Sequence, residues 1–75
     1  MAEGFGTRLR ALRLRAGLTQ QALAQDAGLS VSAIGRLEQG GNPAPETVAS
    51  LAVALDVPIA ALVPQVEPET PSDNG

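Results

Sequence analysis

Arginine is the only basic residue type in this sequence, and its distribution is uneven. Four of the five arginines, Arg8, Arg10, Arg13 and Arg15, lie within eight residues, and the fifth is Arg36. A guanidinium is always charged and forms paired hydrogen bonds with planar or anionic acceptors. The spacing therefore predicts a positive pole near the N-terminus and one isolated cation further along the chain.

Groups that enzymes use for catalysis are scarce. The chain has no Cys and no His, which excludes a disulfide framework, a thiolate nucleophile and an ordinary zinc site. A serine or threonine nucleophile would lack the usual imidazole base. The carboxylates of residues 1–63 are dispersed along the sequence: Glu3, Asp26, Glu38, Glu46 and Asp56. We therefore expect no enzymatic activity, no bound metal and no cofactor.

The net charge of −3 comes from the end of the chain. Residues 1–63 are neutral, whereas residues 64–75 add three prolines and the acids Glu67, Glu69 and Asp73. Such a segment buries too little apolar surface to fold, so we expect a disordered acidic tail or linker after one domain at residues 1–63. No apolar run approaches a membrane span and the N-terminus lacks a secretory signal, so a soluble cytoplasmic protein with no membrane partner is expected.

The apolar residues predict an all-α fold of five helices. Phe5, Leu9, Leu12 and Ala16 form one face of a helix over residues 5–16, which Gly17 ends. Thr19 caps a second helix closed by Gly28, and Ser30 caps a third stopped by Gly40 and Gly41. A fourth helix begins near Pro45 and carries the inward stripe Val48, Leu51, Ala52 and Leu55, and Pro58 opens a short fifth at residues 59–62.

The two helices around Gly28 have the spacing of a helix-turn-helix over about residues 19–39. With Gln20 as the first position, small Ala24 is fifth, where two steeply crossing helices touch. Gly28 is ninth, where the turn needs a left-handed backbone. Ile34 and Leu37, at positions fifteen and eighteen, fix the second helix to the core. The alternative is an ordinary helical hairpin with a glycine turn.

Residues 9–62 resemble the Xre family of helix-turn-helix proteins, which includes lambdoid phage repressors and Cro. The stretches that carry the resemblance are RLRALRLRAGLTQQALAQDAGLSVSAIGRLEQG and NPAPETVASLAVALDV. The resemblance implies a five-helix, lambda-repressor-like domain that binds double-stranded DNA, usually as a homodimer.

Two features of the family map onto named residues. Gln20 falls where members place a glutamine against the DNA backbone or a recognition side chain, and Thr19 lies at the same helix N-terminus, which favours a phosphate. Arg13 and Glu38 fall where many members carry a buried ion pair. The resemblance thus implies that Arg13 is structural rather than part of a DNA contact surface.

Helix geometry assigns the outward face of the third helix. Turning about 100° per residue from Ile34 directs Ser32, Gly35, Arg36 and Gln39 away from the core. In a helix-turn-helix the N-terminal part of this helix approaches base edges in the major groove. Arg36 is suited to guanine or phosphate, and Val31 to a thymine methyl group. The remaining candidate is Ser30, for which capping is the favoured role.

The following loop departs from the family, because it lacks the Lys or Arg that many members carry there. Asn42 is its only polar side chain, and backbone amides at the start of the fourth helix are an alternative phosphate site. So few contacts predict a shallow salt dependence and weak binding by a monomer. A dimer surface is expected among apolar residues near the end of the domain, some of which must be core: Val53, Val57, Ile59, Leu62 and Val63.

The leading interpretation is a sequence-specific transcriptional regulator, more readily a repressor than an activator, that binds a palindromic operator as a homodimer. The alternative is a protein-interaction module, such as an antitoxin, or the DNA-binding part of a larger regulator; exposed Leu14 is a candidate contact for a protein partner. Single-stranded nucleic acid is disfavoured, because Phe5 is the only aromatic residue.

Overall fold

The computed structural model describes residues 4–63 and confirms the predicted all-α fold. No strand occurs in this range, and none of its helices is long and apolar enough to cross a bilayer. The tail predicted for residues 64–75 lies outside the described residues. The helices are α1 (Phe5–Arg15), α2 (Gln20–Ala27), α3 (Val31–Glu38), α4 (Pro45–Leu55) and α5 (Ile59–Leu62).

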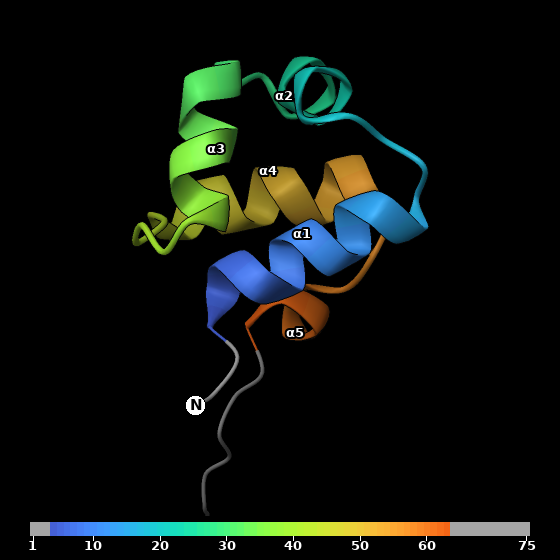
Figure 1. Ribbon diagram of the computed structural model, residues 1–75. Helices are drawn as coiled ribbons and strands as arrows, with labels where there is room; N and C mark the ends of the chain where they lie inside the picture. The colour runs from blue at the N-terminus through green and yellow to red at the C-terminus, as the bar shows by residue number, and fades with distance from the viewer. Residues whose placement is uncertain (1–3, 64–75) are drawn as a thin grey trace, which may run out of the picture.

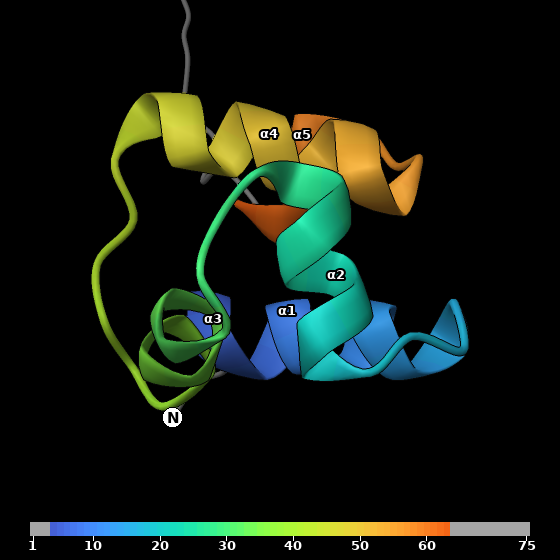
Figure 2. The same cartoon turned by 90° about the horizontal axis from the view of Figure 1, so that it is seen from above.

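The helices surround one small core. Helices α1 and α4 run across the molecule, with α2 packed on one side of them and α5 on the other (Figure 1). Helix α3 packs against α1 and α2 at one end and stands steeply to both α1 and α4 (Figures 1 and 2). One long side of α3 is thereby left without a covering helix in the described part of the chain.

Each helix contributes one large side chain that is fully buried. These side chains, all with 0% of their surface exposed, are Leu9, Leu23, Ile34, Leu51 and Leu62. Burying one such side chain stabilises a fold by roughly 1.5–3 kcal/mol. A domain of this size is marginal unless its apolar residues share one core, and here every helix depends on the same cluster.

The predicted helix boundaries are confirmed at the side chains that cap them. Thr19 Oγ1 accepts a hydrogen bond from Ala22 N at 3.0 Å, and Ser30 Oγ accepts one from Ala33 N at 3.1 Å. Gly28 ends α2 with φ of 72°, the left-handed conformation that costs glycine least. The predicted steep helix pair is therefore present, and it is held by local hydrogen bonds.

Two apolar residues were assigned wrongly from the sequence. Ala16 was expected on the inward face of the first helix, but it is the exposed C-cap of α1. Leu62 was expected at a dimer surface, but it is the buried core residue of α5. The same turn of α5 leaves Ile59 and Val63 exposed, since only one side of so short a helix faces the core.

The predicted ion pair between Arg13 and Glu38 joins α1 to the end of α3. Arg13 Nε donates to Glu38 Oε2 at 2.5 Å and Nη2 donates to Oε1 at 3.1 Å, while Nη1 donates to the carbonyl of Leu18 at 2.9 Å. Only 9% of the Arg13 side chain and 4% of the Glu38 side chain are exposed. A pair so desolvated is stable only because nearly every polar atom has a partner.

The ionised form of Glu38 is favoured in the folded protein. Burial raises the pKa of this carboxyl, but hydrogen bonds from Arg13 and Gln20, with the charges of Arg13 and Arg10, outweigh burial and hold the pKa below its ordinary value. The hydrogen bond from Glu38 likewise raises the pKa of Arg13, against the effect of burial. Arg13 therefore stays charged throughout the accessible pH range.

Gly6 allows α1 to approach the end of α3. A Cβ atom at this position would lie 2.5 Å from the carbonyl oxygen of Leu37 and 2.6 Å from that of Glu38. Both obstacles are backbone atoms, so neither can rotate away. The sequence pattern did not single out Gly6, because a glycine in the first turn of a helix has no signature that distinguishes close packing from simple tolerance.

Replacing Glu38 with alanine should destabilise the domain by about 3–5 kcal/mol, because it leaves the Arg13 charge buried without its carboxylate. Thermal unfolding followed by circular dichroism measures the change. The double substitution Arg13→Met with Glu38→Met should cost less than Glu38→Ala alone, since no unpaired charge remains. An unchanged melting temperature for Glu38→Ala would show that the pair does not hold α1 to α3.

The contribution of Glu38 should also depend on pH in a defined direction. A carboxyl whose pKa is lower in the folded state stabilises the fold fully above its unfolded pKa, about 4.3, and loses that contribution as pH falls through the folded value. The difference in melting temperature between the unmodified protein and Glu38→Gln should be constant between pH 7 and pH 5 and should shrink at lower pH.

The glycines at positions 6 and 35 should respond to alanine with opposite signs. Gly6→Ala should cost about 1–3 kcal/mol, because backbone atoms must move. Gly35→Ala should stabilise the fold by up to about 1 kcal/mol, since a Cβ there meets nothing within 4 Å and alanine favours a helix. Chemical denaturation measures both, and equal effects would rule out the close approach at Gly6.

Candidate nucleic-acid interface

The outward face of α3 is available for contacts, as the helix geometry predicted. Val31, Ser32, Arg36 and Gln39 are exposed, and Gly35 is half-buried. Val31 has 47% of its surface exposed, so its side chain is accessible to a partner. The core residues Ile34 and Leu37 hold this helix in place, so its free side can serve a partner.

The two capping hydroxyls combine a structural role with an exposed position. Thr19 and Ser30 both lie on the surface, and each oxygen already accepts a hydrogen bond from its own helix. Their hydroxyl hydrogens can still be donated to an acceptor such as a phosphate oxygen. The structure thus supports the capping role expected for Ser30 and leaves a single donor for any external contact.

Gln20 has a protein partner that the sequence did not predict. Its Nε2 donates to Glu38 Oε1 at 3.1 Å, so this half-buried side chain joins the first residue of α2 to the last of α3. Only one of its two amide hydrogens and its carbonyl oxygen remain for a contact outside the domain. The spacing alone could not show this, because Gln20 and Glu38 are eighteen residues apart.

Arg36 lies at the edge of α3 that faces the following loop. It lines a hollow together with residues of the α2–α3 turn, α3, the loop and the first turns of α4, among them Ala33, Asn42 and Thr47. The exposed guanidinium of Arg36 and the exposed amide of Asn42 therefore border the same hollow. These two predicted contact residues can reach one partner together.

The start of α4 is less suited to a phosphate than the sequence suggested. Pro45 has no amide hydrogen, and the amides of Thr47 and Val48 already donate to the carbonyl of Ala44. Glu46 places a carboxylate in the first turn, which repels an anion. Of the two helix N-termini considered, the start of α2 is therefore the better one for a phosphate.

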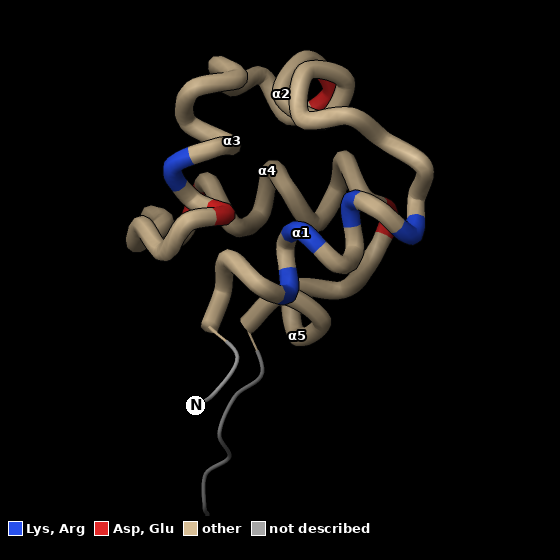
Figure 3. Tube along the Cα trace, in the orientation of Figure 1, with Lys and Arg blue, Asp and Glu red and all other residues tan. Residues whose placement is uncertain are grey.

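Charge within the described residues favours α1 and α3. Figure 3 shows the basic positions along α1 with one further position on α3. Residues 4–63 hold five arginines and four acids, and one arginine and one acid of these are paired in the core. A weakly positive surface of this kind can bind a polyanion through a small number of contacts.

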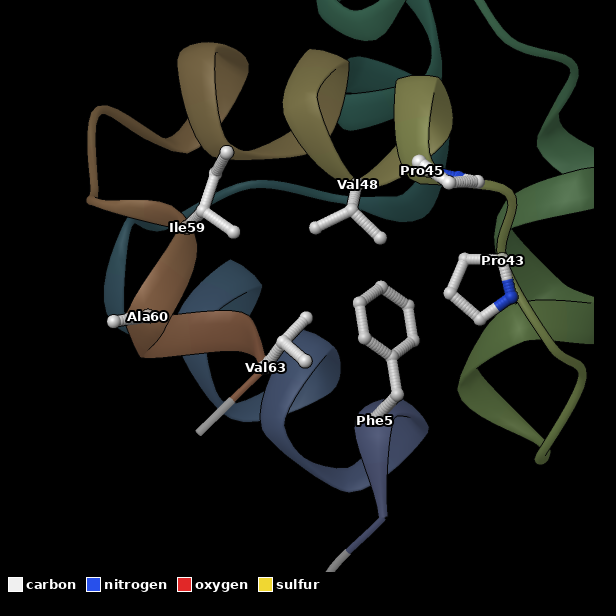
Figure 4. Close-up of a pocket in the computed structure, with 7 residues that line it drawn as sticks. All are labelled: Phe5, Pro43, Pro45, Val48, Ile59, Ala60 and Val63. Atoms are coloured by element: carbon white, nitrogen blue, oxygen red, sulfur yellow. The ribbon is translucent and has the colours of Figure 1, made fainter. Parts of the chain in front are cut away.

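The residues proposed from the sequence for a dimer surface divide into three groups. Leu62 is core, and Val57 is packed against the core. Val53 is 81% exposed and lines a hollow near the end of α2. Ile59 and Val63 border a separate apolar groove of about 710 Å³, whose other walls include Phe5, Pro43 and Val48 (Figure 4).

Comparisons with known proteins identify the family and support the fold. The chain is 44% identical over 63 residues to the HTH-type transcriptional repressor RghR of Bacillus subtilis, a match that covers 81% of the chain and 47% of that protein. The chain thus spans about half the length of this relative. It also matches the crystal structure of the restriction-modification controller protein C.AhdI from Aeromonas hydrophila, with 42% identity and a TM-score of 0.76 over 77% of the chain and 89% of that structure.

The match at the level of the family covers nearly all of the described residues. The family model of the helix-turn-helix domain aligns with residues 5–64, which run from the start of α1 to the end of α5. As its Xre-like spacing predicted, the chain belongs to the helix-turn-helix domain family.

Proposed function

We propose that this protein is a transcriptional regulator that binds double-stranded DNA by placing α3 in the major groove. The observation that carries the proposal is the uncovered side of α3, where the side chains of Val31, Ser32, Arg36 and Gln39 are exposed. A helix on the surface, fixed by Ile34 and Leu37 on its other side, has the form of a recognition helix. Both relatives named above bear the names of regulators, and the controller protein has a similar fold.

The contact residues have different roles in this proposal. Arg36 supplies base readout by paired hydrogen bonds to guanine, and Val31 contacts a thymine methyl group. Ser32 and Gln39 donate or accept at neighbouring positions, and Gly35 lets the helix backbone approach the groove closely. Thr19, Gln20, Ser30 and Asn42 contact phosphates, which position the domain without reading sequence.

Repression is the regulatory outcome that this arrangement supports most directly. A domain that occupies a promoter blocks access by binding alone, whereas activation needs an additional surface for a second protein. One relative is named as a repressor and the other as a controller of a restriction-modification system. We infer that this chain regulates transcription by occupying its operator.

A homodimer would compensate for the small number of contacts in each copy. The groove bordered by Ile59 and Val63 offers an apolar surface at the end of α5, near the start of α1 and the loop after α3 (Figure 4). Two copies joined by these residues around a two-fold axis would present one recognition helix to each half-site. Half-sites would then lie about 34 Å apart in a palindromic operator.

Selection of binding sites from random duplex DNA at low salt tests the function. We expect enrichment of a palindrome. Arg36→Ala should then relax preference at one base pair in each half-site, at a cost of about 1–3 kcal/mol in discrimination. Arg36→Lys is the matched control, because it keeps the charge but loses the paired hydrogen bonds.

Three other outcomes have distinct meanings. No enrichment with a folded protein would reject DNA recognition and favour a protein-interaction module. A uniform loss of affinity across all sequences for Arg36→Ala would place Arg36 on a phosphate. Full activity of Arg36→Lys at the same base pair would show that charge alone is read there.

The dimer surface is tested by sedimentation equilibrium. Ile59→Ser should weaken self-association, because it replaces an exposed apolar side chain that borders the groove. Val53→Ser is the control, since Val53 is more exposed but lines a different hollow. If the two substitutions had the same effect, or if the unmodified protein were a monomer at all concentrations, the groove would not be the interface.

A further inference from the structure

Arg10 is an exposed cation that neither the fold nor the proposed recognition helix explains. Among the described residues its guanidinium has no ion pair within 4.0 Å and no hydrogen bond to another side chain. The Arg10 side chain is exposed on α1, one helical turn before Arg13. An exposed guanidinium without an ion pair can form paired hydrogen bonds with an anionic partner.

Helix geometry puts Arg10 on the side of α1 that faces the helix-turn-helix. At about 100° per residue, Arg10 is only about 60° around the helix from Arg13, whose side chain reaches Glu38 at the end of α3. Arg15 is about 140° from Arg10 and therefore points elsewhere. The two exposed arginines of α1 thus carry the same charge on different faces.

Arg10 and Glu38 border one hollow, together with Thr7, Ala11 and Leu14. The same carboxylate accepts a hydrogen bond from Gln20, the first residue of α2. Glu38 therefore connects the surroundings of Arg10 to the α2 N-terminus, which is the better of the two helix N-termini for a phosphate. Figure 2 shows α1, the start of α2 and α3 along one side of the molecule, with α4 along the other.

Glu38 is not a competing partner for Arg10. Its Oε2 accepts from Arg13, and its Oε1 accepts from both Arg13 and Gln20. The charge of Glu38 is balanced mainly by Arg13, and Arg10 contributes to the lowered pKa of Glu38 only through its nearby charge. No ion pair within 4.0 Å joins Arg10 to Glu38 among the described residues. The charge of Arg10 is left for a partner outside the domain.

We propose that Arg10 binds a phosphate of the DNA backbone beside the base pairs that α3 reads. The inference rests on the proposed function, and it adds a contact from α1 to the surface formed by α2, α3 and the following loop. Arg10 would supply a charge on the α1 side of α3, whereas Arg36 lies on the side that faces the loop. Such a contact fixes the domain on the duplex and adds affinity without adding sequence preference.

The test compares Arg10→Ala with Arg15→Ala, which removes the same charge from another face of the same helix. Binding to the duplex obtained by selection is measured by fluorescence anisotropy between 50 and 200 mM salt. Arg10→Ala should weaken binding equally for all operator variants and lower the slope of log affinity against log salt by about 0.9 for each copy bound. Arg15→Ala should leave that slope nearly unchanged, and Arg10→Lys should restore it.

Several results would overturn the inference. An Arg10→Ala slope equal to that of Arg15→Ala, or a loss confined to one base pair, would exclude a phosphate contact by Arg10. A lowered melting temperature of Arg10→Ala, with Arg10→Gln folded and binding normally, would assign Arg10 to the fold. If the unmodified protein bound no duplex DNA, the proposed function itself would fail. That outcome differs from one in which the unmodified protein binds DNA and Arg10→Ala binds it equally well, which would reject only the role of Arg10.

Discussion

The carboxylate of Glu38 is the point on which the arrangement of the first three helices depends. One oxygen accepts from Arg13 on α1, and the other accepts from both Arg13 and Gln20 on α2, while Glu38 itself ends α3. Arg13 also donates to the carbonyl of Leu18 in the link between α1 and α2. A single buried charge pair therefore sets the position of α3 relative to its two neighbours. Because an ion pair is directional, it specifies an orientation that apolar packing alone would leave less defined.

Because many polar side chains already have partners within the domain, few remain for contacts with another molecule. Arg13 and Glu38 satisfy each other, Ser30 and Thr19 cap helices, and Gln20 is held by Glu38. What remains is a narrow strip of α3 with one cation. If the proposed function holds, backbone contacts and a second copy must supply affinity that so few side chains cannot supply by base contacts.

The fold was predictable from the sequence where a residue type has one dominant structural use. Gly28, Thr19 and Ser30 were assigned to a turn and two caps, and the structure has them there. Leu62 was not predictable in the same way, because a four-residue helix is too short to show which of its apolar residues face inward. Gly6 was missed because the need for a missing Cβ arises from the carbonyls of Leu37 and Glu38, more than thirty residues away.

In the candidate site, too, some features were predictable from the sequence and others were not. The exposed face of α3 followed from helical periodicity, since Ile34 fixes the inward direction. The engagement of Gln20 by Glu38 and the surroundings of Arg10 did not follow, because both depend on how three helices converge. The helical periodicity of the sequence predicts the direction in which a side chain points from its own helix. It does not predict which other helix lies in that direction.

The single core, to which each helix contributes one fully buried side chain, also limits how the domain can move. The buried side chains of all five helices form one cluster, so the loss of any helix exposes part of a core that the other four share. The domain therefore behaves as one cooperative unit, and its backbone amides in the core should exchange with solvent together through global opening. Helix α3 then shares its stability with the rest of the domain, so that loss of the core would remove the α3 surface and expose the chain to proteolysis at the same time.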